Sequence, residues 1–163
     1  MEEIARVMFG VGGLIVNAKT RKILVLKRSS THSDFNQEKW ELLFGRKNEH
    51  EGIVDALHRE AKEEIGIENL VVGSALRIWH FYRGPNSAAN EIIGITFVCE
   101  TETNEPILSA EHSEFRWVGP DEALELINVP GIREDISLYK AGKAASEIWV
   151  SEMNASLQRY PAD

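Results

Sequence analysis

The sequence predicts a domain of the α/β class (α+β by some schemes), with helices packed on a mixed β-sheet. Runs of aliphatic, aromatic and β-branched residues recur along the chain, and segments of helical periodicity lie between and after them. The length of 163 residues suits a single domain over residues 1–163, and the hydrophobic content of 43% can fill its core.

The first half of the chain has the pattern of short strands joined by turns. Residues 5–16 and 23–28 predict the two strands of a hairpin, and the glycines of the first strand indicate a bend or a close backbone approach. Residues 40–44 follow a polar loop and predict a short third strand. Residues 51–65 predict the clearest helix.

The second half continues with strands and ends in helices. Residues 70–83 and 91–100 predict two strands separated by a polar loop, and residues 115–118 predict another. A proline and an aspartate begin a helix expected over residues 120–127. A last helix is expected over about residues 133–157, where apolar positions roughly follow helical spacing.

Composition argues against several classes of protein. The formal net charge of -8 disfavours sequence-independent binding to a nucleic acid polymer, which needs a basic surface. No apolar run approaches the ~20 residues that span a membrane, and the N-terminus carries acids where a secretory signal carries basic residues. We therefore expect a cytoplasmic protein without a membrane partner. The single cysteine, Cys99, lies in an apolar run and is expected in the core.

The predicted helix over residues 51–65 has three kinds of position when it is projected at about 100° per residue. One sector is apolar and should be buried: Ile53, Val54, Leu57, Ala61 and Ile65. The opposite side is polar and should face solvent: Asp55, His58 and Lys62. Carboxylates flank the apolar sector, and Glu64 even projects inside it.

Three of these carboxylates, Glu60, Glu63 and Glu64, are close enough to repel one another, and partial burial makes their ionised forms costly. A bound dication would remove both costs, and oxygen-rich acidic clusters suit Mg²⁺ or Mn²⁺. Arg59 is four residues from Asp55 and from Glu63, so it can orient carboxylates by charge-assisted hydrogen bonds. A salt-bridged surface helix is the alternative that this pattern leaves open.

Residues 45–67 resemble the Nudix box, the sequence motif of the Nudix hydrolases. Every defined position of the motif is filled: Gly45, Glu51, Arg59, Glu60, Ala61, Glu63, Glu64, Gly66 and Ile67. The resemblance covers about residues 5–127, from the opening hairpin to the acidic loop and tryptophan at 111–117. It implies the Nudix α/β/α sandwich with a mixed β-sheet.

The resemblance also implies a role for each charged residue of the box. Glu60, Glu63 and Glu64 would bind the metal and activate water. Glu51 and Arg59 would act as partners that orient these carboxylates.

Further site residues are implied outside the helix. Glu111 stands where MutT-like members carry an extra metal-binding or base glutamate, with Glu114 as a competitor and an ordinary acidic loop as the alternative. Arg28 ends the second strand, where some relatives contact phosphate or substrate; a solvent-facing strand end is equally compatible. Phe44 would offer its backbone carbonyl to the metal. Phe44 and His50 stand where many members have glycine, and Phe44 lacks the freedom of glycine at positive φ.

The implied reaction is metal-dependent hydrolysis of a diphosphate bond in a nucleoside diphosphate linked to another moiety, with Mg²⁺ (or Mn²⁺) as the cofactor. Positioning and charge neutralisation would supply most of the catalysis, and either a helix glutamate or Glu111 would take the proton of the attacking water. The favoured substrate is a (deoxy)nucleoside triphosphate or an oxidised nucleotide, as in MutT-like members. ADP-ribose or a nucleotide sugar, and a non-catalytic nucleotide-sensing domain, are the alternatives. A homodimer stays open.

The aromatic run over residues 79–82 contains candidates for a base-stacking surface, and Tyr82 is a candidate substrate contact. Alternation along a strand predicts that two of the four side chains enter the core. We expect core positions for most of them.

Overall fold

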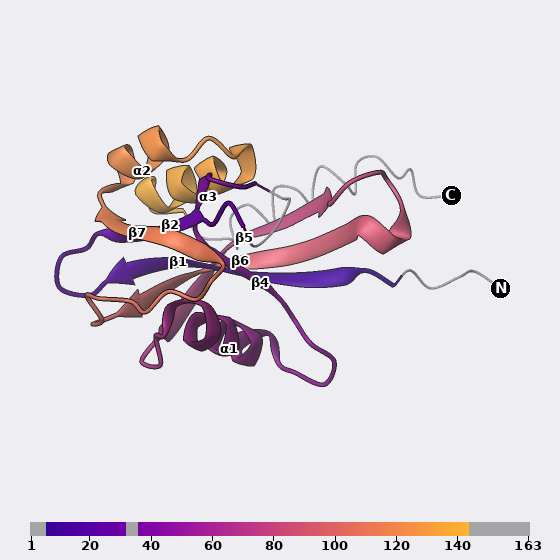
Figure 1. The fold of residues 1–163 in the computed structure, drawn as a ribbon, viewed down its shortest axis with the longest axis horizontal. Helices are drawn as coiled ribbons and strands as arrows, with labels where there is room; N and C mark the ends of the chain where they lie inside the picture. The colour runs from indigo at the N-terminus through magenta and orange to yellow at the C-terminus, as the bar shows by residue number, and fades with distance from the viewer. Residues whose placement is uncertain (1–5, 32–35, 144–163) are drawn as a thin grey trace.

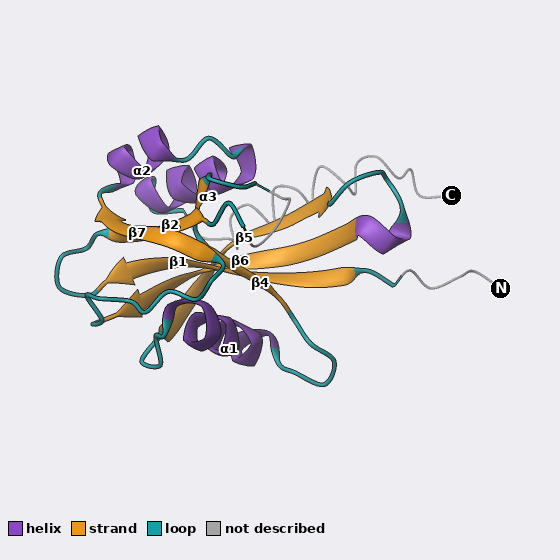
Figure 2. Cartoon of the chain, viewed as in Figure 1, coloured by secondary structure: helices purple, strands orange, loops and turns teal. Residues whose placement is uncertain are grey.

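The computed structural model describes residues 6–31 and 36–143, which form a sheet between two helical layers (Figures 1 and 2). Helix α1 (Ile53–Ile65) covers one face of the sheet, and helices α2 (Pro120–Leu126) and α3 (Pro130–Lys140) cover the other. The predicted α/β/α sandwich is thus confirmed. None of the described helices is long and apolar enough to cross a membrane.

The sheet has seven strands: β1 (Met8–Asn17), β2 (Ile23–Arg28), β3 (Trp40–Glu41), β4 (Leu43–Arg46), β5 (Val71–Tyr82), β6 (Glu91–Thr101) and β7 (His112–Val118). Their order is β3-β2-β1-β6-β5, with β4 paired to β1 and β7 paired to β2. Strands β1 and β6 are parallel, whereas the other described pairs are antiparallel, so the sheet is mixed as predicted.

The predicted opening hairpin forms, but its strands pair at a single position, where Val16 lies opposite Ile23. Strand β1 then continues between β4 and β6, whereas β2 continues between β3 and β7. The strand predicted over residues 40–44 is divided at Leu42 for the same reason: β3 pairs with β2, and β4 pairs with β1.

The last helix, α3, begins and ends earlier than the pattern predicts. Pro130 starts it, because proline has the helical φ and its missing N–H is not needed in the first turn. After Lys140 the chain turns through Gly142, whose φ of 67° lies in the left-handed region that ends helices. The expected continuation over residues 144–157 lies outside the described residues.

Apolar side chains fill both faces of the sheet. Along β1, Val11 and Ile15 belong to the cluster under α1, whereas Leu14 and Val16 belong to the cluster under α2 and α3. Cys99 is fully buried in the first cluster, as predicted, and burial raises the pKa of its thiol to about 12. The central strands are thus held rigidly between the two layers.

The predicted buried face of α1 is correct for Leu57, Ala61 and Ile65 but wrong for Ile53 and Val54. These last two side chains are 37% and 43% exposed, because they occupy the first turn, where the helix does not yet cover the sheet. The buried face of the helix also includes Ala56, Glu60 and Glu64.

The loop before α1 contains a strained residue, His50, with a φ of 60°. A β-carbon is unfavourable in this left-handed region, which accounts for the glycine commonly found at this point of the box. Phe44, in contrast, is a strand residue paired with Gly12, and its φ is not positive. A glycine is therefore not required at this position for the backbone to adopt its conformation.

We expect His50→Gly to keep the free energy of unfolding or raise it by up to about 1 kcal/mol, because relief of strain offsets the greater entropy of the unfolded chain. His50→Val should lower it by about 1–2 kcal/mol, because branching at the β-carbon worsens the clash. Urea unfolding of both variants measures the difference. Equal losses for glycine and valine would contradict a backbone origin.

Candidate active site

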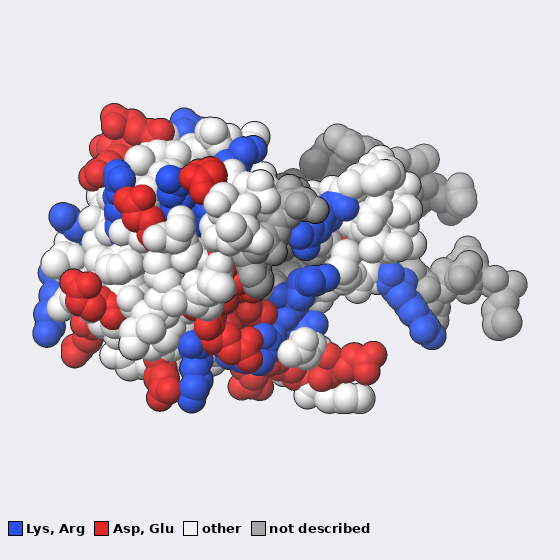
Figure 3. All heavy atoms as spheres, in the orientation of Figure 1, with Lys and Arg blue, Asp and Glu red and all other residues white. Residues whose placement is uncertain are grey.

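A cleft of about 680 Å³ lies beside the C-terminal half of α1 and extends along the other face of the sheet. Its size is that of a small-molecule site. Acidic side chains line one part: Glu41, Glu60, Glu64 and Glu111. Aromatic side chains line another: Phe44, Trp79 and Phe81. Figure 3 shows acidic side chains gathered near the middle of the molecular surface that faces the viewer, with basic side chains beside them.

Two glutamates of α1 are buried against the sheet. Glu60 is 8% exposed and Glu64 is 7% exposed, and both line the cleft. Gly45 of β4 makes the room for one of them, since a β-carbon at Gly45 would lie 2.1 Å from Cδ of Glu60. The box glycine therefore seats a carboxylate at the cleft wall.

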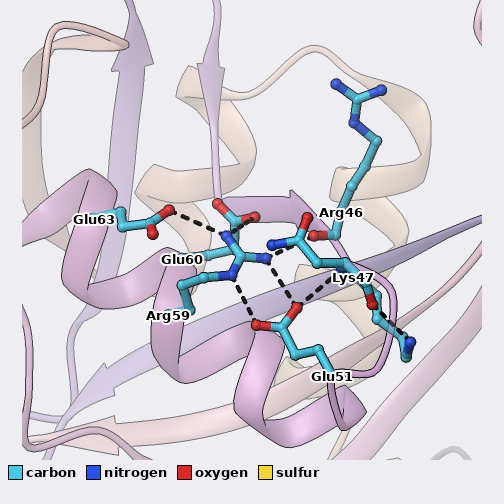
Figure 4. A network of polar contacts seen from close by, with 7 residues as sticks. Arg46, Lys47, Glu51, Arg59, Glu60 and Glu63 are labelled. Carbon is cyan, nitrogen blue, oxygen red and sulfur yellow. Dashed lines mark hydrogen bonds and ion pairs between the residues drawn. The ribbon is translucent and has the colours of Figure 1, made fainter.

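Arg59 holds the box carboxylates together from the other side (Figure 4). Its Nε and Nη2 donate to the two carboxylate oxygens of Glu51 at 2.8 and 3.1 Å, and its Nη1 donates to Glu60 at 2.8 Å. Nη2 also donates to the backbone carbonyl of Arg46, at 2.8 Å. The hydrogen bonds from Arg59 and from the backbone of Asn48 keep the pKa of Glu51 below its usual value. This is the arrangement expected of residues that orient a neighbouring carboxylate.

The structure does not bring Glu63 to the cleft with the other two. Its side chain is 59% exposed, accepts a hydrogen bond from Arg59 at 3.1 Å, and does not line the cavity. Of the glutamates expected at the metal, Glu60, Glu64 and Glu111 line the cleft together. Glu63 lies on a neighbouring, solvent-exposed side of the helix.

Glu64 has the most perturbed environment of these carboxylates. Burial, followed by the charges of Glu111, Glu60 and Glu41, raises its pKa to about 10. Without a counter-charge, Glu64 therefore holds a proton at neutral pH. A cation among these oxygens would favour the ionised form.

The donor set fits a hard divalent cation, because carboxylates of Glu60, Glu64 and Glu111 line one cleft and the charges of Glu111 and Glu60 help to raise the pKa of Glu64. Within residues 6–31 and 36–143, no three His, Cys, Asp or Glu side chains are already gathered closely enough to hold an ion. Small rotations of glutamate side chains are then needed to complete such a site. Phe44 lines the cleft directly before Gly45, so its backbone carbonyl remains a candidate ligand.

The aromatic part of the cleft is built on glycines. The ring of Trp79 lies over Gly10 and Gly94, where a β-carbon would approach its Cη2 to 2.4 and 2.2 Å. Trp79 Nε1 donates to Oγ1 of Thr96 at 3.0 Å, which fixes the ring. The ring centroid of Phe81 lies 5.6 Å away and tilted by 36°.

The expectation that most side chains of residues 79–82 enter the core is wrong. Trp79 and Tyr82 are half-buried, and His80 and Phe81 are exposed, because β5 is an edge strand that continues past the helical layers. Trp79 and Phe81 share the cleft face of the strand. Tyr82 does not line the cleft and packs edge-on against His80, at 5.2 Å between ring centroids.

Two buried polar residues near the acidic part were not singled out by the sequence. Glu41 accepts a hydrogen bond from Nη1 of Arg28 at 3.0 Å, and Nε2 of His112 lies 3.0 Å from the same oxygen. Arg28 also lines the cleft, and its contact with substrate stays a prediction. The available signal was weak: a glutamate in the apolar run WELLF, and a histidine directly after Glu111.

Comparison with known proteins gives one family and many similar structures. The family model described as NUDIX domain matches residues 7–137. The MutT protein from Methanosarcina mazei Go1 is 28% identical, with a TM-score of 0.70 over 87% of this chain and 99% of that one. A search of curated proteins found no significant match.

Two further similar structures are less than 25% identical and support the fold alone. One is the E. coli dihydroneopterin triphosphate pyrophosphohydrolase, with 19% identity and a TM-score of 0.64 over 78% of this chain and 91% of that one. The other is a C. elegans Ap4A hydrolase in a binary complex, with 18% identity and a TM-score of 0.65 over 83% of this chain and 96% of that one.

Proposed function

The chain belongs to the NUDIX family, whose hydrolases cleave diphosphate bonds and typically depend on a divalent metal; from this we propose that it hydrolyses a (deoxy)nucleoside triphosphate or an oxidised nucleotide with Mg²⁺ or Mn²⁺. One observation carries the proposal. A single cleft joins a carboxylate cluster that suits a cation with phosphates to an aromatic surface that suits a planar base.

The acidic part would take the phosphates. Glu60, Glu64 and Glu111 are the residues that would hold the cation, with the carbonyl of Phe44 as a further ligand. Bound there, Mg²⁺ or Mn²⁺ would offset the charge of the phosphates and lower the pKa of water.

The residues of the chain would then position and deprotonate the attacking water. Glu64 and Glu111 face the cleft, so either can accept its proton. Arg59 fixes Glu60 through the contact at 2.8 Å and so limits its motion during the reaction. Arg28 lines the same cleft and brings a positive charge within reach of a phosphate.

The aromatic part would take the base. Trp79 and Phe81 form a tilted pair on one face of β5, and Phe44 meets Trp79 edge-on at 6.0 Å between ring centroids. Stacking on such a surface tolerates different planar rings. A pterin triphosphate or a dinucleoside polyphosphate, the substrates named for two similar structures, would therefore bind in the same way, with phosphates at the acidic part and a planar ring at the aromatic part.

ADP-ribose or a nucleotide sugar is the alternative substrate class, and a non-catalytic nucleotide sensor is the alternative function. Retention of every box carboxylate favours the enzyme over the sensor.

We expect a screen of Mg²⁺-dependent phosphate and pyrophosphate release to give the highest kcat/KM on triphosphates and to lose all activity with a chelator. The panel contains nucleoside triphosphates, 8-oxo-dGTP, a pterin triphosphate, ADP-ribose, nucleotide sugars and dinucleoside polyphosphates. A preference for ADP-ribose or nucleotide sugars would overturn the substrate. Tight nucleotide binding without turnover on any compound would overturn the enzyme in favour of the sensor.

A further inference from the structure

His112 is a buried histidine at the start of β7 whose two ring nitrogens face two carboxylates. Its side chain is 1% exposed, and Nε2 lies 3.0 Å from Oε1 of Glu41. Nδ1 has no hydrogen-bond partner in the part of the chain that the structure describes. A carboxylate oxygen of Glu64 lies 3.8 Å from Nδ1, just beyond hydrogen-bond range.

A purely structural histidine would not be expected to leave this nitrogen unpaired. A buried polar atom without a partner is costly, and an apolar side chain of similar size would fill the same space without that cost. The unpaired nitrogen therefore indicates a partner that comes into range in another state of the site. Glu64 fits this description, because its carboxylate oxygen already lies 3.8 Å from Nδ1.

The rest of the surroundings hold His112 still. Glu41 is itself fixed by Arg28 at 3.0 Å, with side chains that are 9% and 16% exposed. The backbone also ties the segment before β7 to the end of α1, because the N–H of Ser109 donates to the carbonyl of Glu64 at 2.8 Å. The histidine and the backbone of Glu64 therefore form one rigid unit, so the distance from Nδ1 to the carboxylate of Glu64 changes with the side-chain rotation of Glu64.

We propose that His112, anchored by Glu41, is a positioning residue that sets the carboxylate of Glu64 for cation binding. The proposal rests on the proposed function, since it assigns Glu64 to the cation. His112 acts through Glu64 and is not placed in contact with the substrate. Partners that hydrogen-bond metal-binding side chains typically change metal affinity by about 10- to 100-fold when they are removed.

Two conservative variants separate the two ring nitrogens. His112→Gln places an amide near the position of Nε2, toward Glu41, and loses the polar atom that faces Glu64. His112→Asn keeps a polar atom near the position of Nδ1 and loses the contact with Glu41. The asparagine is smaller and leaves the larger void, so its effect on packing should be the greater one.

The measurements are the dissociation constant of Mn²⁺, by electron paramagnetic resonance without substrate, and thermal unfolding of the metal-free protein. We expect His112→Gln to weaken Mn²⁺ binding about 10- to 100-fold. His112→Asn should weaken it less, although it should melt at the lower temperature. His58→Gln, on a half-buried residue of α1 that does not line the cleft, is the control and should bind Mn²⁺ like the wild type.

Wild-type Mn²⁺ affinity in His112→Gln would overturn the role of His112 but leave the proposed function standing. The same conclusion would follow if the variant that melts at the lower temperature also lost more Mn²⁺ affinity. Absence of Mn²⁺ binding by the wild-type protein would overturn the proposed function and this inference with it. The two failures are therefore distinguishable.

Discussion

Glu64→Gln should lower kcat for diphosphate hydrolysis by about 10²- to 10⁴-fold and leave the fold intact. The substitution keeps the shape of the side chain and removes the charge that a cation and an attacking water need. Steady-state kinetics at saturating Mg²⁺, together with circular dichroism, measure both effects. The control is Glu68→Gln, at a side chain that is 70% exposed and pairs with Lys62. Turnover by Glu64→Gln at the control's rate would contradict the assignment.

The same variant has a second signature, in the pH dependence of stability. The pKa of Glu64 is about 10 in the folded protein, compared with an ordinary value of 4.5. Between these values the folded state holds a proton that the unfolded state has lost, so the free energy of unfolding should fall as pH rises. Glu64→Gln should lack this contribution. Melting temperatures in a chelator at pH 6 and pH 8.5 compare the two proteins, and parallel pH profiles would count against the raised pKa.

Gly45→Ala should reduce activity by about 10²-fold, because the new β-carbon occupies the space of a carboxylate. It would lie 2.1 Å from Cδ and 2.3 Å from Cγ of Glu60, so that side chain has to leave its seat beside Arg59. The required Mg²⁺ concentration should rise together with the loss of kcat. A titration of activity against Mg²⁺ measures both.

The matched control for this glycine is Gly119→Ala. Gly119 has a φ of -70°, and a β-carbon there would meet no described atom within 4 Å. This variant should retain normal activity. Equal activity and equal Mg²⁺ dependence in the two alanine variants would show that the position of the Glu60 side chain beside Gly45 has no catalytic importance.

Much of the acidic part of the site could be predicted from the sequence, because it depends on one helix. Helical spacing places Glu60 and Glu64 on the face of α1 that carries Leu57, and their burial follows. The same projection failed for Ile53, since periodicity does not show where along its length a helix meets the sheet.

The aromatic part could not be predicted, because it depends on strand register. Strands β1 and β6 are far apart in sequence, yet their parallel pairing puts Gly10 beside Gly94, and both lie under Trp79. Alternation predicted that two of the four side chains at residues 79–82 enter the core, and core positions were expected for most of them. Their burial depends instead on how far the helices cover this edge strand. The contact between Glu41 and His112 likewise joins residues that only the tertiary structure brings together.

The central claim is that carboxylates of α1 and the loop before β7 bind the cation that holds the scissile phosphates. Anomalous scattering from crystals soaked in Mn²⁺ and a non-hydrolysable nucleotide tests it most directly. The predicted result is a peak at coordination distance, roughly 2.1 Å, from oxygens of Glu60 and Glu64, with phosphate oxygens on its other side. The contradicting result is a nucleotide bound in the cleft with no anomalous peak beside these glutamates, provided that the protein used for the crystals hydrolyses its substrate with Mn²⁺ in solution.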